Sequence, residues 1–500
     1  MISFSSILNG LLNILNVEAM LWLVLGVVVG IIFGAIPGLT AATGIAVFTP
    51  ITFGMDFAPA FGFLLGLYCG GFYGGSIPAI LIHTPGAPGN VASTIDGYPM
   101  AQKGKAGKAL SISVVSSWMG GTFSAFCLLI FAGIIAKFAL QFGAEEFFSV
   151  ALIGLSCIIG ISNGPLSLGV IAASLGMLLA CIGIDPMDGI TRYTFGSIKM
   201  MKGISTVPAL VGLFAFSEMI TKSESPEFAT DGLSGKITGV KPDWKEYWQH
   251  KWLLLKSMTI GMLIGAVPGT GPTIASWLSY SEAKRCSKHP EEFGNGSVEG
   301  VMACESSNNA VTGGAIIPMV TLGIPGDPCT AILLNALIIQ GLTPGPTLIA
   351  KNPDLVTTIL WILLIGNAIM LFFGLVCAKF FPKILSIPAK MLFPIVIVLC
   401  VVGAYAVNNS SFDMWVMFGL GIFGYIMIKF GFPVAPMVLG IILGPIMEPN
   451  FRRALIASKM NWFTFFTRPM SCGFIIAAVV LSILMYRNSH GGKKKKTKEA

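Results

Sequence analysis

Two proline-glycine blocks occur twice in this chain, in the same order. The stretch Pro78–Pro88 recurs 240 residues later as Pro318–Pro328, with a proline-glycine pair at the same place in each copy. Upstream of it, Gly30–Gly38 recurs 231 residues later as Gly261–Gly269. Proline lacks a backbone N–H and interrupts helices. We therefore expect two related halves, each with two interruptions of its helices.

The composition places these blocks in a membrane. Hydrophobic residues make up 54% of the chain and charged residues 11%, whereas about a quarter of a soluble domain is charged. Backbone groups freed at an interruption must meet protein, water or a ligand, because lipid cannot bond to them. We predict an all-α polytopic membrane protein in two repeated halves, with broken helices and re-entrant helical hairpins. The apolar stretches predict roughly ten to twelve membrane-spanning helices.

Four segments follow from the distribution of polar residues. They are a first transmembrane repeat (1–220), a polar, interfacial linker (221–251), a second transmembrane repeat (252–487) and a basic tail (488–500).

The linker and the tail indicate how the chain sits in the membrane. Trp244, Trp248 and Trp252 are four residues apart and share one face of a helix. This spacing predicts an amphipathic helix at the headgroup level; a partner-docking surface is the alternative. Lys493–Lys496 follow the last apolar stretch, which predicts a cytoplasmic C-terminus. A short basic tail does not indicate nucleic-acid binding.

The first block predicts an anion site. After a Pro-Gly interruption the next helix begins with free N–H groups and the positive end of its dipole. Thr40 and Thr43 follow the first interruption, and Thr270 and Thr273 follow the second. Their hydroxyls can add donors. The alternative is a proline kink whose threonines bond back to their own helix.

The second block predicts a chain reversal. Several helix breakers within four residues favour a helical hairpin that turns inside the membrane. Each turn exposes carbonyl oxygens from one helix and N–H groups from the other, which suits a cation beside an anion.

Few ionisable residues lie near these reversals. A carboxylate at membrane depth is by default a functional hypothesis. Asp327 lies within the second turn, and Asp96 and Glu305 lie near the two turns. Asp327 is either a cation ligand or a cap for the turn. His83 has a glycine at its repeat position, so we expect it to pack or hydrogen-bond. Asn308 can offer Na⁺ an uncharged oxygen.

The predicted site residues form two sets. The predicted substrate-binding residues are Pro37, Gly38, Thr40, Thr43, Gly86, Asn90, Gly269, Thr270, Thr273, Gly326 and Thr330. The predicted cation-binding residues are Pro85, Asn308, Asn309, Pro325 and Asp327. No catalytic residue, cofactor or resident metal is predicted; the only metal ion expected is a transported Na⁺.

The motifs resemble the TctA family, the large membrane subunit of tripartite tricarboxylate transporters. The resemblance rests on the Gly34–Thr40 block and on the stretches Pro78–Asn90 and Asn308–Pro328, and it covers about residues 15–480. It implies a multi-pass symporter of the bacterial inner membrane that is driven by a cation gradient, that of Na⁺, and takes up citrate-like or other carboxylates. It also implies two partners besides the lipid bilayer: a small membrane subunit of about four spans and a periplasmic solute-binding protein.

Two other classes of protein stay as alternatives. A passive anion channel lacks support because nothing resembles a carbonyl filter or a charged ring. An intramembrane enzyme needs a catalytic set, and no His-Glu-x-x-His motif occurs. The ten cysteines include no close pair, so neither a disulfide framework nor a metal site is expected.

Overall fold

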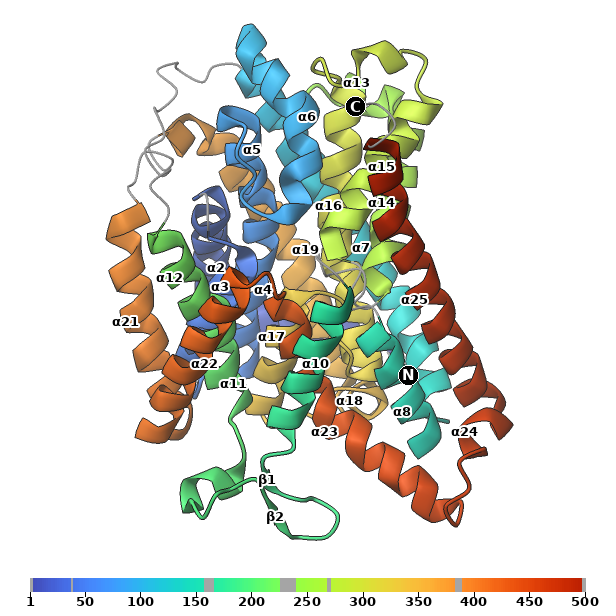
Figure 1. The fold of residues 1–500 in the computed structure, drawn as a ribbon. Helices are drawn as coiled ribbons and strands as arrows, with labels where there is room; N and C mark the ends of the chain where they lie inside the picture. Colours follow the sequence, from blue (N-terminus) through green and yellow to red (C-terminus); the bar gives the residue numbers. More distant parts are fainter. Residues whose placement is uncertain are drawn as a thin grey trace. The chain divides into compact units, whose positions relative to one another are not determined.

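The computed structural model describes residues 3–36, 39–156, 166–224, 240–267, 271–382 and 389–496 (Figure 1). These residues are helical almost throughout, and the prediction of an all-α polytopic membrane protein is confirmed. Within them, six helices are long and apolar enough to cross a membrane: Val17–Ala35, Phe57–Ile82, Pro88–Ala139, Pro353–Val376, Ser411–Lys429 and Val434–Ala457. Shorter apolar helices accompany them. The number of ten to twelve spans stays a prediction.

The chain forms two compact units, and each unit takes a segment from both predicted halves. Unit 1 consists of Met1–Ala136 and Lys222–Leu399, and unit 2 consists of Lys137–Thr221 and Cys400–Ala500. Both duplicated blocks and their counterparts belong to unit 1.

The helices of unit 1 carry the duplicated blocks. From the first half they are α1 (Phe4–Ile14), α2 (Val17–Ala35), α3 (Ala41–Phe48), α4 (Phe57–Gly74), α5 (Ser76–Ile82), α6 (Val91–Met100) and α7 (Ala106–Ala139), which runs just past the unit's limit. From the second they are α13 (Trp244–Gln249), α14 (Lys251–Ala266), α15 (Gly271–Cys286), α16 (Val298–Leu322), α17 (Pro328–Ile339), α18 (Pro346–Lys351) and α19 (Pro353–Val376). α21 (Ala389–Asn408) begins in unit 1 and ends in unit 2.

Glycines bring the backbones of paired helices into contact in unit 1. α2 packs along α4, and α14 packs along α16. A Cβ built at Gly30 would lie 2.5 Å from the Leu67 carbonyl oxygen, and one at Gly265 would lie 2.7 Å from that of Val311. Small residues permit such close approach of membrane helices. These positions therefore exclude any side chain.

The first block ends one helix and begins the next in both halves. α2 ends at Ala35 and α3 begins at Ala41, while α14 ends at Ala266 and α15 begins at Gly271. The predicted residues Pro37, Gly38, Gly269 and Thr270 lie outside the described residues.

The second block reverses the chain between α5 and α6 and again between α16 and α17. We call residues 83–90, which connect α5 to α6, the first reversal, and residues 323–327, which connect α16 to α17, the second reversal. Each begins at a left-handed residue, His83 at φ 57° and Gly323 at φ 71°. Extended backbone follows, and Gly86 N–H donates to the Gly75 carbonyl oxygen at 3.0 Å. The reversal is thus a helix, an extended return and a second helix, rather than two helices joined by a tight turn.

Polar loops of the two halves meet in pairs. Lys103 Nζ, after α6, donates to the Asn295 carbonyl oxygen before α16 at 2.6 Å. Gln340 Nε2, after α17, donates to the Met55 carbonyl oxygen before α4 at 3.2 Å. The loop after each reversal therefore contacts the loop that precedes the long helix of the other half.

The linker is anchored next to the first of these loop pairs. Lys108 pairs with Glu246 of α13 at 2.8 Å, and Figure 1 shows α6, α13 and α15 at one end of unit 1. Trp244, Trp248 and Trp252 are each more than half exposed. A break at His250 separates α13 from α14, so the three tryptophans do not share one continuous helix.

Unit 2 is a second helical bundle with one small hairpin. Its helices are α8 (Ala144–Ser156), α10 (Leu166–Ala180), α11 (Thr206–Leu210), α12 (Ser217–Ser223), α22 (Ser411–Lys429), α23 (Val434–Ala457), α24 (Thr464–Thr467) and α25 (Pro469–Lys496). α12 runs just past the unit's limit at Thr221, and α12 and α25 include residues of the predicted linker and tail. α23 packs against α8 and α10. The hairpin strands β1 (Gly183–Ile184) and β2 (Thr191–Arg192) pair antiparallel, with Gly183 opposite Arg192.

Candidate functional site

Each long helix of unit 1 contacts the reversal of the other half. Tyr68 of α4 donates its hydroxyl to Asp327 Oδ2 at 2.5 Å. Asn308 of α16 approaches Gly89, where an added Cβ would lie 2.6 Å from Asn308 Oδ1. Tyr68 and Asn308 stand 240 residues apart, which is the spacing of the repeated block. The two reversals are therefore both in contact with the long helix of the opposite half.

Asp327 caps helix α17. Its Oδ1 accepts the Thr330 N–H at 2.7 Å and the Thr330 hydroxyl at 2.8 Å, and the Asp327 N–H donates to the Thr330 hydroxyl at 2.9 Å. This reciprocal pair is a capping box. With Tyr68 on Oδ2, both carboxylate oxygens of Asp327 have donors. The capping role considered for this residue is present; the cation-binding role stays a prediction.

A buried cluster surrounds Glu305. This residue lies on α16 and is fully buried. Its Oε2 accepts the hydroxyls of Ser76 at 2.6 Å and Ser117 at 3.1 Å, and its Oε1 accepts the hydroxyl of Ser93. Asn309 Nδ2 in turn donates to Ser117 Oγ at 2.8 Å. We call these five residues the Glu305 cluster. It joins α5, α6, α7 and α16.

Two asparagines beside Glu305 have unused hydrogen-bonding atoms. Asn309 is fully buried and its Oδ1 has no partner, while Asn308 is 1% exposed and neither its Oδ1 nor its Nδ2 has one. A buried polar atom without a partner costs about 1–3 kcal/mol. Such an atom requires an explanation, of which an ion or a water is the simplest.

The first block places its threonines at the start of α3. Thr40 Oγ1 accepts the Thr43 N–H at 3.1 Å, and the two hydroxyls lie 2.8 Å apart. The hydroxyl of Thr40 thus caps its own helix, as the alternative to an anion site predicts. Thr273 is half-buried in the first turn of α15. A Cβ at Gly89 would lie 2.8 Å from Pro272 Cβ, so this turn adjoins the first reversal.

The remaining predicted residues belong to the two reversals or follow them directly. Asn90 Nδ2 donates to Ser76 Oγ at 2.8 Å and to the Phe72 carbonyl oxygen at 3.2 Å. An added Cβ at Gly326 would lie 2.7 Å from the Gly265 carbonyl oxygen. Pro85 is half-buried and Pro325 is buried. Asn90 and Asn309 therefore meet around Ser76, Ser117 and Glu305, whereas Asp327 and Thr330 lie beside Tyr68.

Asp96 and His83 have structural contacts. Asp96 Oδ1 accepts three backbone N–H groups at 2.8–2.9 Å, from Gly294, Gly296 and Ser297. Its Oδ2 accepts the Tyr280 hydroxyl at 2.9 Å. His83 packs on Tyr98, with ring centroids 4.7 Å apart. The expectation that His83 packs agrees with this contact.

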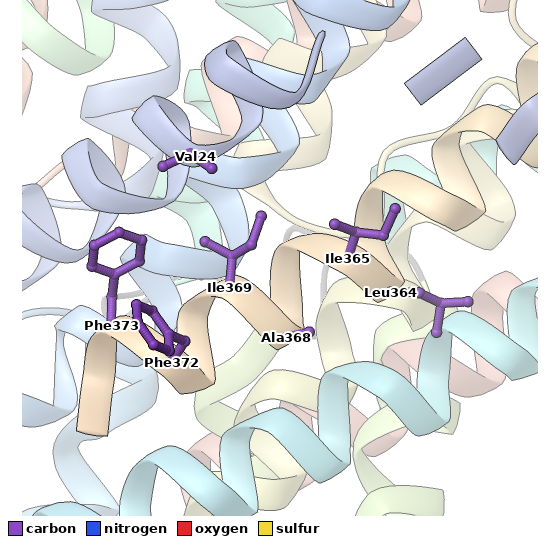
Figure 2. A pocket seen from close by; sticks show the side chains of 7 residues that line it. All are labelled: Val24, Leu364, Ile365, Ala368, Ile369, Phe372 and Phe373. Atoms are coloured by element: carbon purple, nitrogen blue, oxygen red, sulfur yellow. The ribbon is translucent and has the colours of Figure 1, made fainter. Parts of the chain in front are cut away.

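An apolar groove lies between α2 and α19. Its volume is about 570 Å³. Figure 2 shows its lining side chains, which are Val24, Leu364, Ile365, Ala368, Ile369, Phe372 and Phe373. No polar side chain lines it, so it offers nothing that binds an anion or a cation.

Several residues of the site did not stand out in the sequence. Glu305 is a functional candidate in the sequence but belongs to neither predicted set, and no sequence pattern points to Tyr68, Ser93 or Ser117. Ser76 precedes Pro78 in the second block, but a serine near a glycine pair predicts no particular contact. The partners of Glu305 lie 188–229 residues away in sequence, and no local pattern encodes such pairs.

The family model of the tripartite tricarboxylate transporter TctA family matches residues 20–439. An uncharacterized 52.8 kDa protein in the TAR-I ttuC' 3'region of Agrobacterium vitis is 36% identical over 470 residues, which cover 93% of each chain. An uncharacterized protein in the TAR-II ttuC' 3'region of the same organism is 40% identical over 227 residues, 45% of this chain and 94% of that protein. No solved structure matches. The resemblance found in the motifs is thereby confirmed: the chain is a multi-pass membrane protein and belongs to the tripartite tricarboxylate transporter TctA family.

Proposed function

We propose that this chain is the large permease subunit of a Na⁺-coupled, binding-protein-dependent system that takes up carboxylates. Its family is a transporter family, and TctA proteins are the large component of tripartite transporters. The observation that carries the proposal is the meeting of both reversals with the long helices of the opposite halves, around buried polar groups that have unused hydrogen-bonding atoms. Interrupted helices in two related halves are typical of secondary transporters.

The substrate is held, in this proposal, by the predicted substrate-binding residues. Arginine and lysine are almost absent from the apolar spans, so an anion relies on helix N-termini, hydroxyls and amides. The starts of α3 and α15 supply Thr40 and Thr273, and the reversals supply Gly86 and Gly326. This arrangement binds an anion more weakly than arginine pairs do. A co-transported cation supplements it.

The coupling cation binds, in this proposal, in the region of the predicted cation-binding residues. Asn308 and Asn309 are supported by their buried, unpartnered oxygens. Asp327 adds a buried carboxylate, and Pro85 and Pro325 add backbone carbonyl oxygens. Na⁺ is a hard cation that takes oxygen ligands of these kinds.

Two partners belong to the proposed system. A small membrane subunit of about four spans accompanies the permease, and a periplasmic solute-binding protein delivers the carboxylate. The permease lies in a bacterial inner membrane with its C-terminus in the cytoplasm.

A transport panel tests this function. The purified chain and its small membrane partner are reconstituted in proteoliposomes, and uptake of radiolabelled mono-, di- and tricarboxylates is measured with and without the binding protein. Uptake of one carboxylate class that requires the binding protein is expected and names the substrate. Uptake at the same rate with and without the binding protein supports a channel instead. The absence of uptake of every carboxylate tested contradicts the proposal.

A further inference from the structure

Glu305 is a buried carboxylate without a positively charged partner. It is fully buried, and its hydrogen-bond donors are the neutral hydroxyls of Ser76, Ser93 and Ser117. No lysine, arginine or histidine in the described parts of the chain forms an ion pair with it. A buried charge is costly unless it is paired. The ionised form of Glu305 therefore requires a cation that the described residues of the protein do not provide.

The atoms around Glu305 suit an oxygen-liganded cation. A serine hydroxyl that donates to Glu305 still has lone pairs and can rotate to offer its oxygen. Asn309 donates through Nδ2 to Ser117, which leaves its buried Oδ1 free. Apart from the carboxylate these ligands are uncharged. One negative charge among neutral oxygens balances one positive charge, so the cluster matches a monovalent rather than a divalent ion.

Asp327 differs from Glu305 in the nature of its donors. Its Oδ1 accepts a backbone N–H from Thr330, and its Oδ2 accepts the Tyr68 hydroxyl. A backbone N–H has no lone pair to offer to a cation. The Thr330 hydroxyl is held in the capping box and is not free to rotate toward one. Every donor to Glu305, by contrast, is a hydroxyl.

We propose that the Glu305 cluster is a Na⁺ site of this chain, in which Glu305 supplies the charge and Asn309 Oδ1 and the three serine hydroxyls supply neutral oxygens. This inference deepens the proposed function and rests on it. Ser76 also accepts a hydrogen bond from Asn90 at 2.8 Å, and Gly75 accepts one from Gly86. A Na⁺ ion bound to Ser76 would therefore lie next to residues that hold the first reversal in place, and substrate-binding residues are predicted in that reversal.

Direct binding of ²²Na⁺ to the purified protein in detergent tests the assignment without any transport. Glu305→Gln keeps the shape of the side chain and removes its charge. It is expected to weaken Na⁺ binding at least about tenfold, which corresponds to the loss of one strong interaction. Glu299→Gln is the matched control, because Glu299 lies on the same helix but pairs with His250 at 3.2 Å at its partly exposed start. This control is expected to bind Na⁺ like the parent.

A second variant guards against misfolding. Asn309→Ala retains the charge and removes one neutral oxygen, so a smaller loss of affinity with unchanged binding capacity is expected. Gel filtration and thermal unfolding show whether each variant is folded. Parent-like Na⁺ binding by both Glu305→Gln and Asn309→Ala overturns the assignment, as does a parent protein that binds no Na⁺. A parent protein that binds no ²²Na⁺ but still takes up the carboxylate in proteoliposomes leaves the transport function standing and rejects Na⁺ at this site.

Discussion

Glu305 and Ser76, 229 residues apart in the chain, are joined by a hydrogen bond of 2.6 Å in the interior of unit 1. Ser76 is the first residue of α5, and Glu305 lies in the N-terminal third of α16. This bond connects α16, the long helix of the second half, to α5, the helix that leads into the first reversal. Some substitutions near this bond change only the packing of the helices, whereas others change the groups that are proposed to bind the ion. Comparing them distinguishes the two effects.

Gly75 holds Asn90 next to Ser76, so an alanine there displaces Asn90. An added Cβ would clash with Asn90 Oδ1 and lie 3.3 Å from the Ala87 amide nitrogen. Gly75→Ala is expected to destabilise the protein by about 1–3 kcal/mol, as overpacking does, and to abolish uptake. Gly133→Ala is the control, because no atom lies within 4 Å of its added Cβ. Thermal unfolding and uptake of both variants check this; equal stability of the two contradicts it.

His83 occupies a left-handed position at which the other half has Gly323. Left-handed backbone destabilises the folded state by about 1–2 kcal/mol at a non-glycine residue. The ring contact of His83 with Tyr98 stabilises it by about 0.5–1.5 kcal/mol. His83→Gly is therefore expected to change the free energy of unfolding by less than about 1 kcal/mol and to leave uptake intact. Gly323→Ala, the reciprocal change, is expected to destabilise the protein by about 1–2 kcal/mol. A large loss of uptake in folded His83→Gly protein would show that the imidazole itself is needed.

Asp327→Asn separates capping from ion binding. Asparagine is as good an N-cap as aspartate, so α17 is expected to keep its start. We expect the Na⁺ concentration for half-maximal uptake to rise about threefold to tenfold, equivalent to about 0.7–1.4 kcal/mol, with little change in the relative uptake of different carboxylates. Na⁺ activation curves of the variant and the parent, measured side by side, check this. Superimposable curves count against a cation-binding role of Asp327.

Asp96 fixes the loop that precedes α16. Its three bonds from backbone N–H groups are charge-assisted, and bonds of this kind contribute about 1.5–3 kcal/mol each. Asp96→Ala is expected to destabilise the protein by about 3 kcal/mol or more and to expose the loop around Gly294 and Gly296 to proteases. Tyr280→Phe removes one bond only and is expected to cost about 1 kcal/mol. Similar protease resistance of Asp96→Ala and the parent would contradict this role.

The hairpin of unit 2 is expected to lose stability in acid. The Met187 N–H and the Arg452 guanidinium, at 2.9 and 2.5 Å, lower the pKa of Asp185 below its ordinary value of 3.8. A carboxyl with a lowered pKa in the folded state stabilises it above the ordinary value, and the gain disappears as the pH falls through the lowered pKa. The parent should therefore unfold at a higher temperature than Asp185→Asn at pH 7, and the difference should shrink below about pH 4. A difference that is constant with pH would contradict this.

The sequence predicts the positions at which helices are interrupted. It does not predict the conformation of the residues between those helices. Pro-Gly pairs lie between α2 and α3 and within both reversals, because proline and glycine act locally on the backbone. Pro78 and Pro318, however, lie inside α5 and α16, and the chain turns only at the left-handed residues five positions later. Left-handed backbone at a histidine has no local signature.

The site was less predictable than the interruptions. Asn308, Asn309 and Asp327 are predicted cation ligands because their side chains carry oxygens, and they lie in the buried interior of unit 1. The three serines around Glu305 cannot be predicted from the sequence, since buried serine is common in membrane helices and the contacts join distant segments. The kind of ligand that one side chain can bind follows from its residue type. Which side chains lie together follows only from the packing of the helices.

The most direct test of the account is accumulation of the identified carboxylate in proteoliposomes that contain the permease, its small membrane partner and the binding protein. An inward Na⁺ gradient is expected to drive the internal concentration above the external one, and Glu305→Gln is expected to abolish that accumulation while Glu299→Gln retains it. Equilibration to the same level with and without the gradient would contradict Na⁺-coupled transport and identify the chain as a passive pathway.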